Sequence, residues 1–312
     1  MRAHYSHIGL ARLCGWFGIT RQAYYQNQWR VEDTSVEQYL VLGQVKSIRE
    51  THPRMGVRKL YELLEDFMLE HQIKMGRDAL FNLLADHNLL VRKRKKRVHT
   101  TNSFHWLRKY PNLVKGLVPK QANELWVSDI TYWKIETGYL YISLITDVFS
   151  HKIVGYNVGN TLKTKESLKA LQMAVSSLSE SDRPIHHSDR GLQYCSGEYV
   201  ELLAVNNIRI SMTQSGDPLE NPVAERINGI LKDEYLMDYT IENLGQAKQV
   251  LESVVQVYNL ERPHMSIGNL TPEFVYQTGT KAQQLWKNYY KKNSNLVNVL
   301  QDQELSVNLL QD

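Results

Sequence analysis

The chain has 312 residues, of which 42% are hydrophobic, enough for a sizeable buried core and one or two smaller modules. No segment approaches the roughly 18 consecutive apolar residues of a membrane span, and the N-terminus lacks the apolar region of a signal peptide. The only cysteines, Cys14 and Cys195, lie far apart and indicate neither a disulfide framework nor a cysteine zinc site. These features predict a soluble, cytoplasmic protein.

The net charge of +4 is distributed unevenly along the chain. Residues 91–120 contain ten Lys or Arg residues and no Asp or Glu, which leaves the rest of the chain at −6. Lys and Arg side chains bind DNA without reading its sequence, because contacts to phosphates release condensed counterions. The segment predicts either a DNA contact or a solvated linker, and its charge alone does not distinguish them. Its candidate DNA-binding residues are Arg92, Lys93, Arg94, Lys95, Lys96 and Arg97.

Residues 1–35 have the pattern of a helix-turn-helix. Apolar residues at helical spacing precede Gly18, where a tight turn would lie, and Thr20 can cap the next helix. In a DNA-binding helix-turn-helix the second helix enters the major groove. An ordinary helical hairpin has the same pattern. The residues that the second helix would present to DNA are Thr20, Arg21, Gln22 and Tyr24.

A second helical module is predicted over residues 36–98. Its leucine-rich helical pattern is broken at His52–Gly56 (HPRMG) and Lys74–Gly76. The last helix, which begins near Arg77, runs into the basic segment, so Arg77 is a further candidate for DNA binding. Residues 99–120 then read as a linker.

The pattern changes after residue 123, and residues 121–278 predict an α/β domain. Alternating aromatic and β-branched residues over 124–159 favour two or three antiparallel strands. Helical and strand patterns then alternate, which is typical of a mixed sheet with helices on its faces. Residues 279–312 form a C-terminal tail. The later predicted elements are helix 165–178, strand 184–189, helix 197–206, strand 208–212, helix 221–236 and helix 244–260.

Three carboxylates in this domain are candidates for a metal site. Asp129 lies within a strand, Asp189 at the end of a second strand, and Glu225 in the first turn of a helix. Taken singly, each is more often a solvated surface residue. Together they can converge on hard divalent cations, which prefer oxygen ligands. A pair of such cations activates a water or a 3′-hydroxyl in phosphodiester chemistry.

These motifs resemble the catalytic domain of DDE transposases, which is of the retroviral integrase type. The N-terminal stretches LCGWFGITRQAYY and HPRMGVRKL resemble the DNA-binding region of the same family. The closest resemblance is to the second-reading-frame product (OrfB) of the insertion sequence 3 family. The matching stretches of the core are WVSDITYW (126–133), DVFSHKIVGY (147–156), HHSDRGLQY (186–194), residues 211–234 and YNLERPHMSIGNLTPEFV (258–275).

The resemblance implies an RNase H-like fold, a mixed five-stranded sheet flanked by helices and preceded by small helix-turn-helix modules. It implies that Asp129, Asp189 and Glu225 bind two Mg²⁺ or Mn²⁺ ions. It also gives Lys232 a role in holding the DNA end, since seven residues beyond Glu225 is two turns of an α-helix. Asn221, Arg262 and His264 are further candidates for DNA contact. The family usually has Asp-Asn-Ala where this chain has Glu220-Asn221-Pro222, a departure that puts the role of Asn221 in doubt.

The implied function is metal-dependent strand cleavage and strand transfer at the terminal inverted repeats of an insertion sequence. The implied partners are double-stranded DNA, further copies of the chain assembled on that DNA, and a first-reading-frame (OrfA) partner or fusion. Two alternatives remain open: an RNase H-like nuclease without strand transfer, and a helix-turn-helix regulator without enzymatic activity.

Three residues near the candidate carboxylates have other expected roles. Asp147 is expected to be a turn residue. His186 and His187 either orient a carboxylate or DNA, or pack beside a strand.

Overall fold

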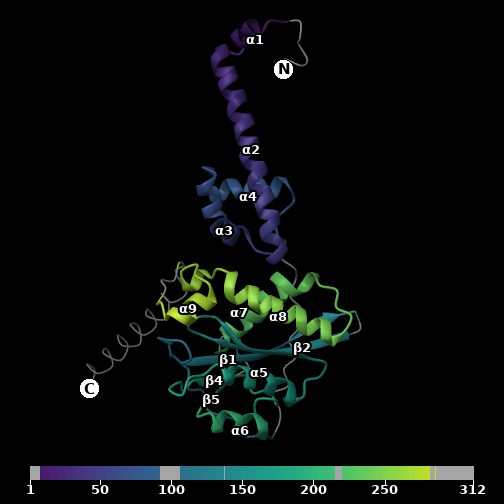
Figure 1. Cartoon of the computed structure of the whole chain (residues 1–312), viewed down its shortest axis with the longest axis vertical. Helices are drawn as coiled ribbons and strands as arrows, with labels where there is room; N and C mark the ends of the chain where they lie inside the picture. The colour runs from purple at the N-terminus through teal and green to yellow at the C-terminus, as the bar shows by residue number, and fades with distance from the viewer. Residues whose placement is uncertain (1–7, 92–105, 137, 215–219, 282–284, 286–312) are drawn as a thin grey trace, which may run out of the picture. The chain divides into compact units, whose positions relative to one another are not determined.

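The computed structural model describes residues 8–91, 106–136, 138–214, 220–281 and 285 (Figure 1). The chain divides into two compact units, which we call the helical unit and the sheet unit. The helical unit comprises Met1–Thr100 and Gly229–Tyr239, and the sheet unit comprises Thr101–Asn228 and Thr240–Asp312. Among the described residues, no helix has the length and apolar character needed to cross a membrane.

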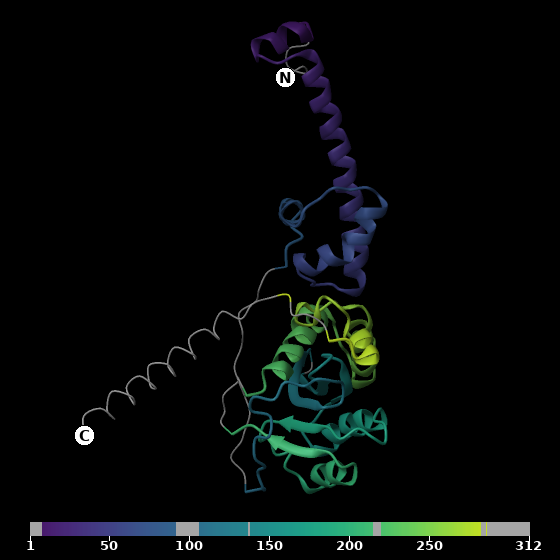
Figure 2. The same cartoon turned by 90° about the vertical axis from the view of Figure 1, so that its left-hand side faces the viewer.

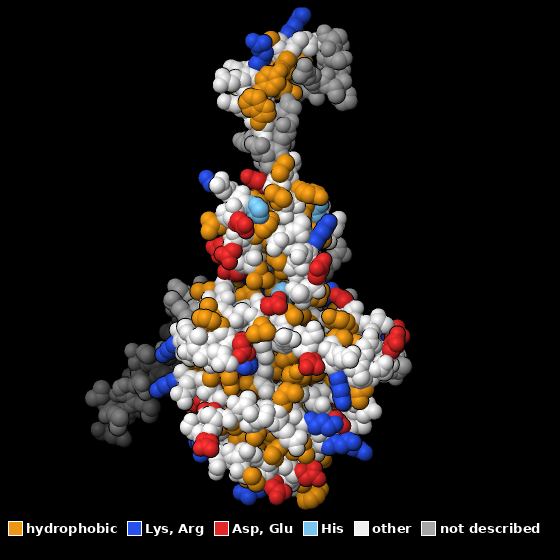
Figure 3. All heavy atoms as spheres, viewed as in Figure 1, with side chains coloured by type: hydrophobic (Ala, Val, Ile, Leu, Met, Phe, Trp, Pro, Cys, Tyr) orange, Lys and Arg blue, Asp and Glu red, His pale blue; other side chains and the backbone are white. Residues whose placement is uncertain are grey.

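The helical unit begins with α1 (Leu10–Trp16) and α2 (Arg21–Thr51). Gly18, in the turn between them, has a φ of +66°, and the Thr20 side chain accepts a hydrogen bond from the Ala23 amide at 3.0 Å. The predicted turn and helix cap are therefore both present. Helix α2 extends for 31 residues through residue 35, the boundary predicted from the sequence. One continuous helix thus joins the two predicted modules. Figure 3 shows hydrophobic side chains at the surface of the end of the molecule that carries α1 and the start of α2. Trp16 of α1 is 61% exposed.

The core of the helical unit lies where the end of α2 packs against α3 (Val57–Glu70) and α4 (Arg77–Asp86). The helices are interrupted at residues 52–56, as predicted, and at residues 71–76, which include the predicted 74–76. Buried side chains recur every three or four residues along each helix, as expected for helices that bury one face. The buried helical residues are Val41, Val45, Leu60, Leu64, Met68, Leu80, Leu83 and Leu84, and Met55 and Ile73 join the same core from the segments between the helices.

The sheet unit is built on a mixed five-stranded sheet in the order β3-β2-β1-β4-β5. The first three strands pair antiparallel, while β4 and β5 pair parallel with β1 and β4 respectively. Antiparallel neighbours can be joined by short turns, whereas parallel neighbours need a crossover, and helices supply it here. The strands are β1 (Leu125–Ile135), β2 (Gly138–Asp147), β3 (Ile153–Gly159), β4 (Ile185–Ser188) and β5 (Arg209–Met212).

Helices cover both faces of this sheet (Figures 1 and 2). Helices α5 (Thr164–Ser176) and α6 (Gly197–Val205) lie on one face and share a hydrophobic core with the strands. Helices α8 (Leu244–Glu261) and α9 (Pro272–Thr278) lie on the opposite face. This arrangement confirms the predicted RNase H-like fold class.

Helix α7 (Pro222–Ile230) differs from its prediction in one respect that bears on function. The sequence predicted one regular helix over 221–236, but α7 continues as a π-helix (Leu231–Tyr235) and a short 3-10 helix (Leu236–Asp238). A π-turn holds more residues than an α-turn, so seven residues no longer correspond to two turns. The π-helix therefore shifts Lys232 from the position that regular α-helical turns would give it relative to Glu225, and the shared face expected from the spacing is not regular. Lys232 is half-buried in the helical unit, and a role for it in DNA binding stays a prediction.

Candidate active site

Asp129 lies in the central strand β1, opposite Leu144 of β2. Its Oδ1 accepts a hydrogen bond from the Ile130 amide at 2.9 Å, and its Oδ2 accepts one from Asn228 Nδ2 at 2.7 Å. Burial of the carboxylate is the largest of the causes that raise the pKa of Asp129 to about 7, followed by the negative charge of Asp189 and, more weakly, that of Glu225. Two of the predicted carboxylates, Asp189 and Glu225, therefore act electrostatically on the third.

Asp189 follows directly after β4, which pairs parallel with β1. Val127 is opposite His187 in this pairing, and continuing the register by two residues brings Asp189 beside Asp129 on the same side of the sheet. Asp189 Oδ1 accepts a hydrogen bond from the Gly191 amide at 2.9 Å. A Cβ at Gly191 would lie 2.9 Å from the same oxygen, so a larger residue there would crowd the carboxylate.

Glu225 is in the first turn of α7 and is exposed. Two asparagines fix α7 against β1, one at each end of the helix. Asn221 Nδ2 donates to the Ser128 carbonyl at 3.0 Å, and Asn228 Nδ2 donates to Asp129. Asn221 is buried, and this bond gives it a positioning role, which replaces the DNA contact expected for it. Asn228 was not predicted, although it lies one helical turn from Glu225 on the same face.

The chemistry of these side chains fits divalent cations, because all three candidates are carboxylates. In the described residues, however, no group of three or more His, Cys, Asp or Glu side chains is arranged closely enough to hold an ion. Burial, and after it the charges of Asp189 and Glu225, raise the pKa of Asp129, and a bound cation would favour the ionised carboxylate.

His186 and His187 have structural partners in β4. His186 Nε2 lies 2.8 Å from Ser128 Oγ and 3.0 Å from Tyr199 Oη, and burial lowers its pKa to about 3. His187 Nδ1 lies 2.8 Å from Ser211 Oγ, and its Nε2 lies 3.0 Å from the Glu220 carbonyl. His186 thus packs within the core, whereas His187 holds the chain immediately before α7.

Asp147 is a turn residue, as expected from its position at the end of β2. It is fully buried, and it accepts hydrogen bonds from the Ser150 amide at 2.8 Å, the Ser150 hydroxyl at 2.5 Å and the Asn123 amide at 2.9 Å. These donors account for its conformation without any role in the active site.

Arg262 and His264 are buried, at 1% and 6% exposure. Arg262 Nη1 lies 2.9 Å from His264 Nε2, and the His264 ring meets the Tyr258 ring edge-on. The structure therefore corrects the expectation that they contact DNA: neither side chain presents itself to solvent, and both contribute to packing.

The candidate DNA-binding residues of the helical unit fall into two groups. Arg21 and Gln22 are exposed in the first turn of α2, and Arg77 is exposed at the start of α4, 3.6 Å from Asp78. Thr20 caps α2 and Tyr24 is half-buried, so these two have local structural roles. The basic residues Arg92–Arg97 lie outside the described residues.

Comparison with known proteins gives a consistent result. The chain matches the integrase core domain family over residues 119–218 and again over residues 206–272. An uncharacterized 31 kDa protein of insertion element IS600 from Shigella sonnei is 34% identical over 83% of this chain and 96% of its own length. The transposase for insertion sequence element IS629 from the same organism is 31% identical over 72% of this chain and 74% of its own length. The HTLV-2 integrase catalytic core domain, solved in complex with magnesium, aligns with a TM-score of 0.41 at 21% identity, over 50% of this chain and 97% of that one.

The mixed sheet with helices on both faces and the match to the integrase core define a polynucleotidyl transferase of the DDE class. The high coverage of the insertion-sequence proteins narrows the assignment further. The chain belongs to the insertion sequence 3 family of DDE transposases.

Proposed function

We propose that this transposase cleaves and joins DNA strands at the terminal inverted repeats of its insertion sequence, with Asp129, Asp189 and Glu225 as ligands of two Mg²⁺ or Mn²⁺ ions. The observation that best supports the proposal is that three carboxylates from separate elements, β1, the loop after β4 and α7, act at one place: burial first, then Asp189 and Glu225, raise the pKa of Asp129. Carboxylates that repel one another without a cation are suited to share one.

Bound divalent cations would supply the positive charge that activates the attacking hydroxyl and stabilises the leaving oxygen. Neighbouring residues of the chain hold and orient the three carboxylates. Asn228 directs one oxygen of Asp129, the Gly191 amide directs one oxygen of Asp189, and Asn221 fixes the start of α7. The positions of the ligands are therefore determined by partners in β1, in the loop after β4 and in α7.

The DNA partners follow from the same proposal. Arg21 and Gln22 would read the terminal repeat in the major groove, while the basic residues Arg92–Arg97 would hold phosphates without sequence preference. Lys232 would hold the DNA end. The proposal also includes the assembly of several copies on DNA and a first-reading-frame (OrfA) partner or fusion. It places the protein at the bacterial nucleoid in the cytoplasm.

Incubation of the purified chain with Mg²⁺ and a labelled duplex that ends in the terminus of its own element tests this function. We expect cleavage and joining by the wild type, and loss of both reactions in Asp129→Asn, Asp189→Asn and Glu225→Gln. Chelation of the metal should stop the reaction, and added Mg²⁺ should restore it. Each variant should bind the duplex at least as tightly as the wild type, because the substitutions keep the size of the side chain and remove a negative charge that repels phosphates.

Glu198→Gln is the matched control, since Glu198 is an exposed acid in the first turn of α6. It should cleave and join as the wild type does. A Glu225→Gln protein that still cleaves and joins would show that Glu225 is not the third ligand and would direct attention to Glu220 or Glu234.

A further inference from the structure

Segment Gly229–Tyr239, which follows α7, belongs to the helical unit although it lies more than 120 residues beyond the rest of that unit. Its partner is the HPRMG stretch (His52–Gly56) at the end of α2. His52 Nδ1 lies 2.9 Å from Tyr235 Oη, and the two rings meet edge-on with centroids 5.9 Å apart. His52 and Tyr235 are 3% and 2% exposed. The pair is thus a buried contact between segments separated by 183 positions.

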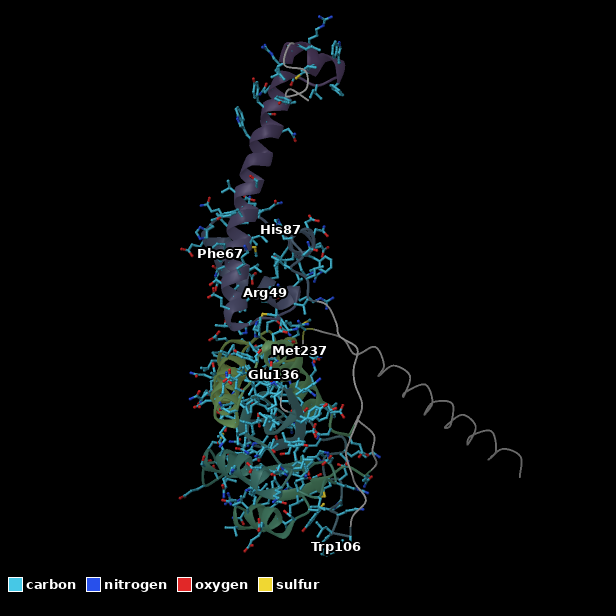
Figure 4. All side chains as sticks on the ribbon, turned by 90° about the vertical axis from the view of Figure 1, so that its right-hand side faces the viewer. Arg49, Phe67, His87, Trp106, Glu136 and Met237 are labelled. Atoms are coloured by element: carbon cyan, nitrogen blue, oxygen red, sulfur yellow. The ribbon has the colours of Figure 1, made fainter. Side chains whose placement is uncertain are left out.

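Two cationic side chains extend this contact. Arg54 Nε donates to the Asp233 carbonyl at 2.9 Å, and Arg54 Nη1 lies 3.6 Å from Asp238 Oδ2. Lys59 Nζ in α3 lies 3.3 Å from Glu234 Oε1, and these two side chains are only 16% and 19% exposed. The cations of the HPRMG stretch and α3 therefore bind a segment of the same chain. Figure 4 labels Arg49 near the end of α2 and Met237 in the bound segment.

The bound segment is the direct continuation of the helix that carries Glu225. Helix α7 starts at Pro222, has Glu225 in its first turn and passes into the π-helix Leu231–Tyr235 without an intervening loop. A continuous helical backbone is stiff, because each turn is held by hydrogen bonds to the next. Whatever holds residues 231–238 therefore restrains the helix that presents Glu225.

We propose that the HPRMG stretch and α3 form a clasp on residues 231–238 that positions Glu225 for catalysis. The HPRMG stretch is then a structural element and does not bind DNA. The clasp is defined by His52, Arg54 and Lys59 on one side and by Tyr235, Glu234, Asp233 and Asp238 on the other. The catalytic half of this inference rests on the proposed function. The structural half, docking of the segment, stands independently of it.

A charge exchange in the full-length chain tests the clasp. Lys59→Glu places two acids together, Glu234→Lys places two bases together, and the double variant Lys59→Glu/Glu234→Lys restores an opposite pair. We expect amide hydrogen exchange of residues 231–238 to quicken by about threefold to tenfold in each single variant and to return toward the wild-type rate in the double variant. Lys46→Glu and Glu62→Lys make the same charge changes at exposed positions of α2 and α3 and should leave this exchange unchanged.

The same proteins separate positioning from DNA binding. The single variants should lower the rate of Mg²⁺-dependent cleavage at saturating DNA by about tenfold, with an unchanged Kd for the terminal-repeat duplex, and the double variant should recover most of that rate. Tyr235→Phe, which keeps the ring and removes only the hydroxyl, should show the same split between rate and Kd.

Three results would overturn the clasp. The first is that residues 231–238 exchange at the wild-type rate in both single variants. The second is that the double variant exchanges as fast, and cleaves as slowly, as the single variants. The third is that DNA affinity falls while the exchange rate does not change. A wild-type chain that does not cleave DNA, but shows the predicted exchange pattern, would count against the proposed function while supporting the docking of the segment.

Discussion

Asp129 makes the stability of this protein depend on pH. Its pKa is raised to about 7, by burial first and then by Asp189, whereas in the unfolded chain it would be near 4. An acid whose pKa is higher in the folded state contributes stability that is complete below the unfolded pKa and is lost as the pH rises through the folded one. Ionised Asp129 therefore destabilises the metal-free fold above about pH 7.

Asp129→Asn should raise the thermal stability of the chelator-treated protein at pH 8.5 by about 3–6 °C, since the variant has no charge to bury. The variant amide can keep both hydrogen bonds, because Asn228 Oδ1 is buried without a partner and a flip of that side chain turns it into an acceptor. The Tm difference should shrink as the pH falls below 7 and vanish near pH 4. Equal Tm values at pH 8.5 would contradict the raised pKa.

Asn228 orients Asp129 and should matter for catalysis although it bears no charge. Asn228→Ala removes the 2.7 Å bond to Asp129 Oδ2, and we expect cleavage to slow by about 10–100-fold, as is typical when a group that orients a metal ligand is removed. DNA affinity should not change. Added Mg²⁺ should recover part of the rate if the loss is one of metal affinity, and cleavage at the wild-type rate without it would exclude an orienting role.

The sequence singled out the three candidate carboxylates, but it did not indicate every residue that hydrogen-bonds to them. Asp129 and Asp189 stand out because a charge within or directly after an apolar strand needs a reason to be there. Asn228 gives no such signal, since its contact with Asp129 spans 99 positions and forms only after β1 and α7 have come together. Its spacing of three residues from Glu225 was the one available indication.

The turn between β2 and β3 depends on one buried carboxylate. Asp147 accepts hydrogen bonds from Ser150 and from the Asn123 amide, so both of its oxygens are used. In Asp147→Asn, the new side-chain NH₂ group faces hydrogen-bond donors of Ser150 or Asn123, which it cannot accept from. The substitution should therefore lower the free energy of unfolding by about 1–3 kcal/mol. Denaturant unfolding measures this, and cleavage at 20 °C should persist. Loss of cleavage in a folded Asp147→Asn protein would place Asp147 in the active site instead.

Strands and helices of the sheet unit follow their sequence patterns closely, because each buries a face with the period of its own backbone. The predicted strand over 184–189 is β4, and the predicted helix over 165–178 is α5. The π-helix at Leu231–Tyr235 is the exception. No local residue pattern distinguishes it from an α-helix, and its surroundings are set by distant partners such as His52. Tertiary contacts, rather than propensity, decide the geometry there.

The division of the molecule into two units also goes beyond what the sequence could indicate. Composition changes near residue 120 and predicts where the sheet begins. Nothing in the local sequence shows that Gly229–Tyr239 leaves the sheet unit and joins the helical one. The assignment depends on contacts such as that of His52 with Tyr235, which joins segments 183 positions apart.

The basic run Arg92–Arg97 carries much of the chain's excess positive charge, and we expect it to supply much of the affinity for DNA of any sequence. Six consecutive basic residues, Arg92–Arg97, lie outside the described residues, so the prediction rests on charge alone. Each phosphate contact that is lost should flatten the slope of log affinity against log salt concentration by about 0.9. Replacing all six by Gln or Ser should therefore weaken binding to random and terminal-repeat duplexes alike, and reduce the salt dependence of both.

The matched control is the triple variant Arg92→Lys/Arg94→Lys/Arg97→Lys, which keeps the charge and changes the side chains. It should preserve the salt slope, because counterion release depends on the number of charges and not on the geometry of guanidinium groups. Filter binding or fluorescence anisotropy over 50–300 mM salt measures both slopes. If the neutral variant keeps the wild-type affinity and slope, the run is a solvated linker, and DNA binding must then be assigned to exposed residues of the helical unit such as Arg21, Gln22 and Arg77.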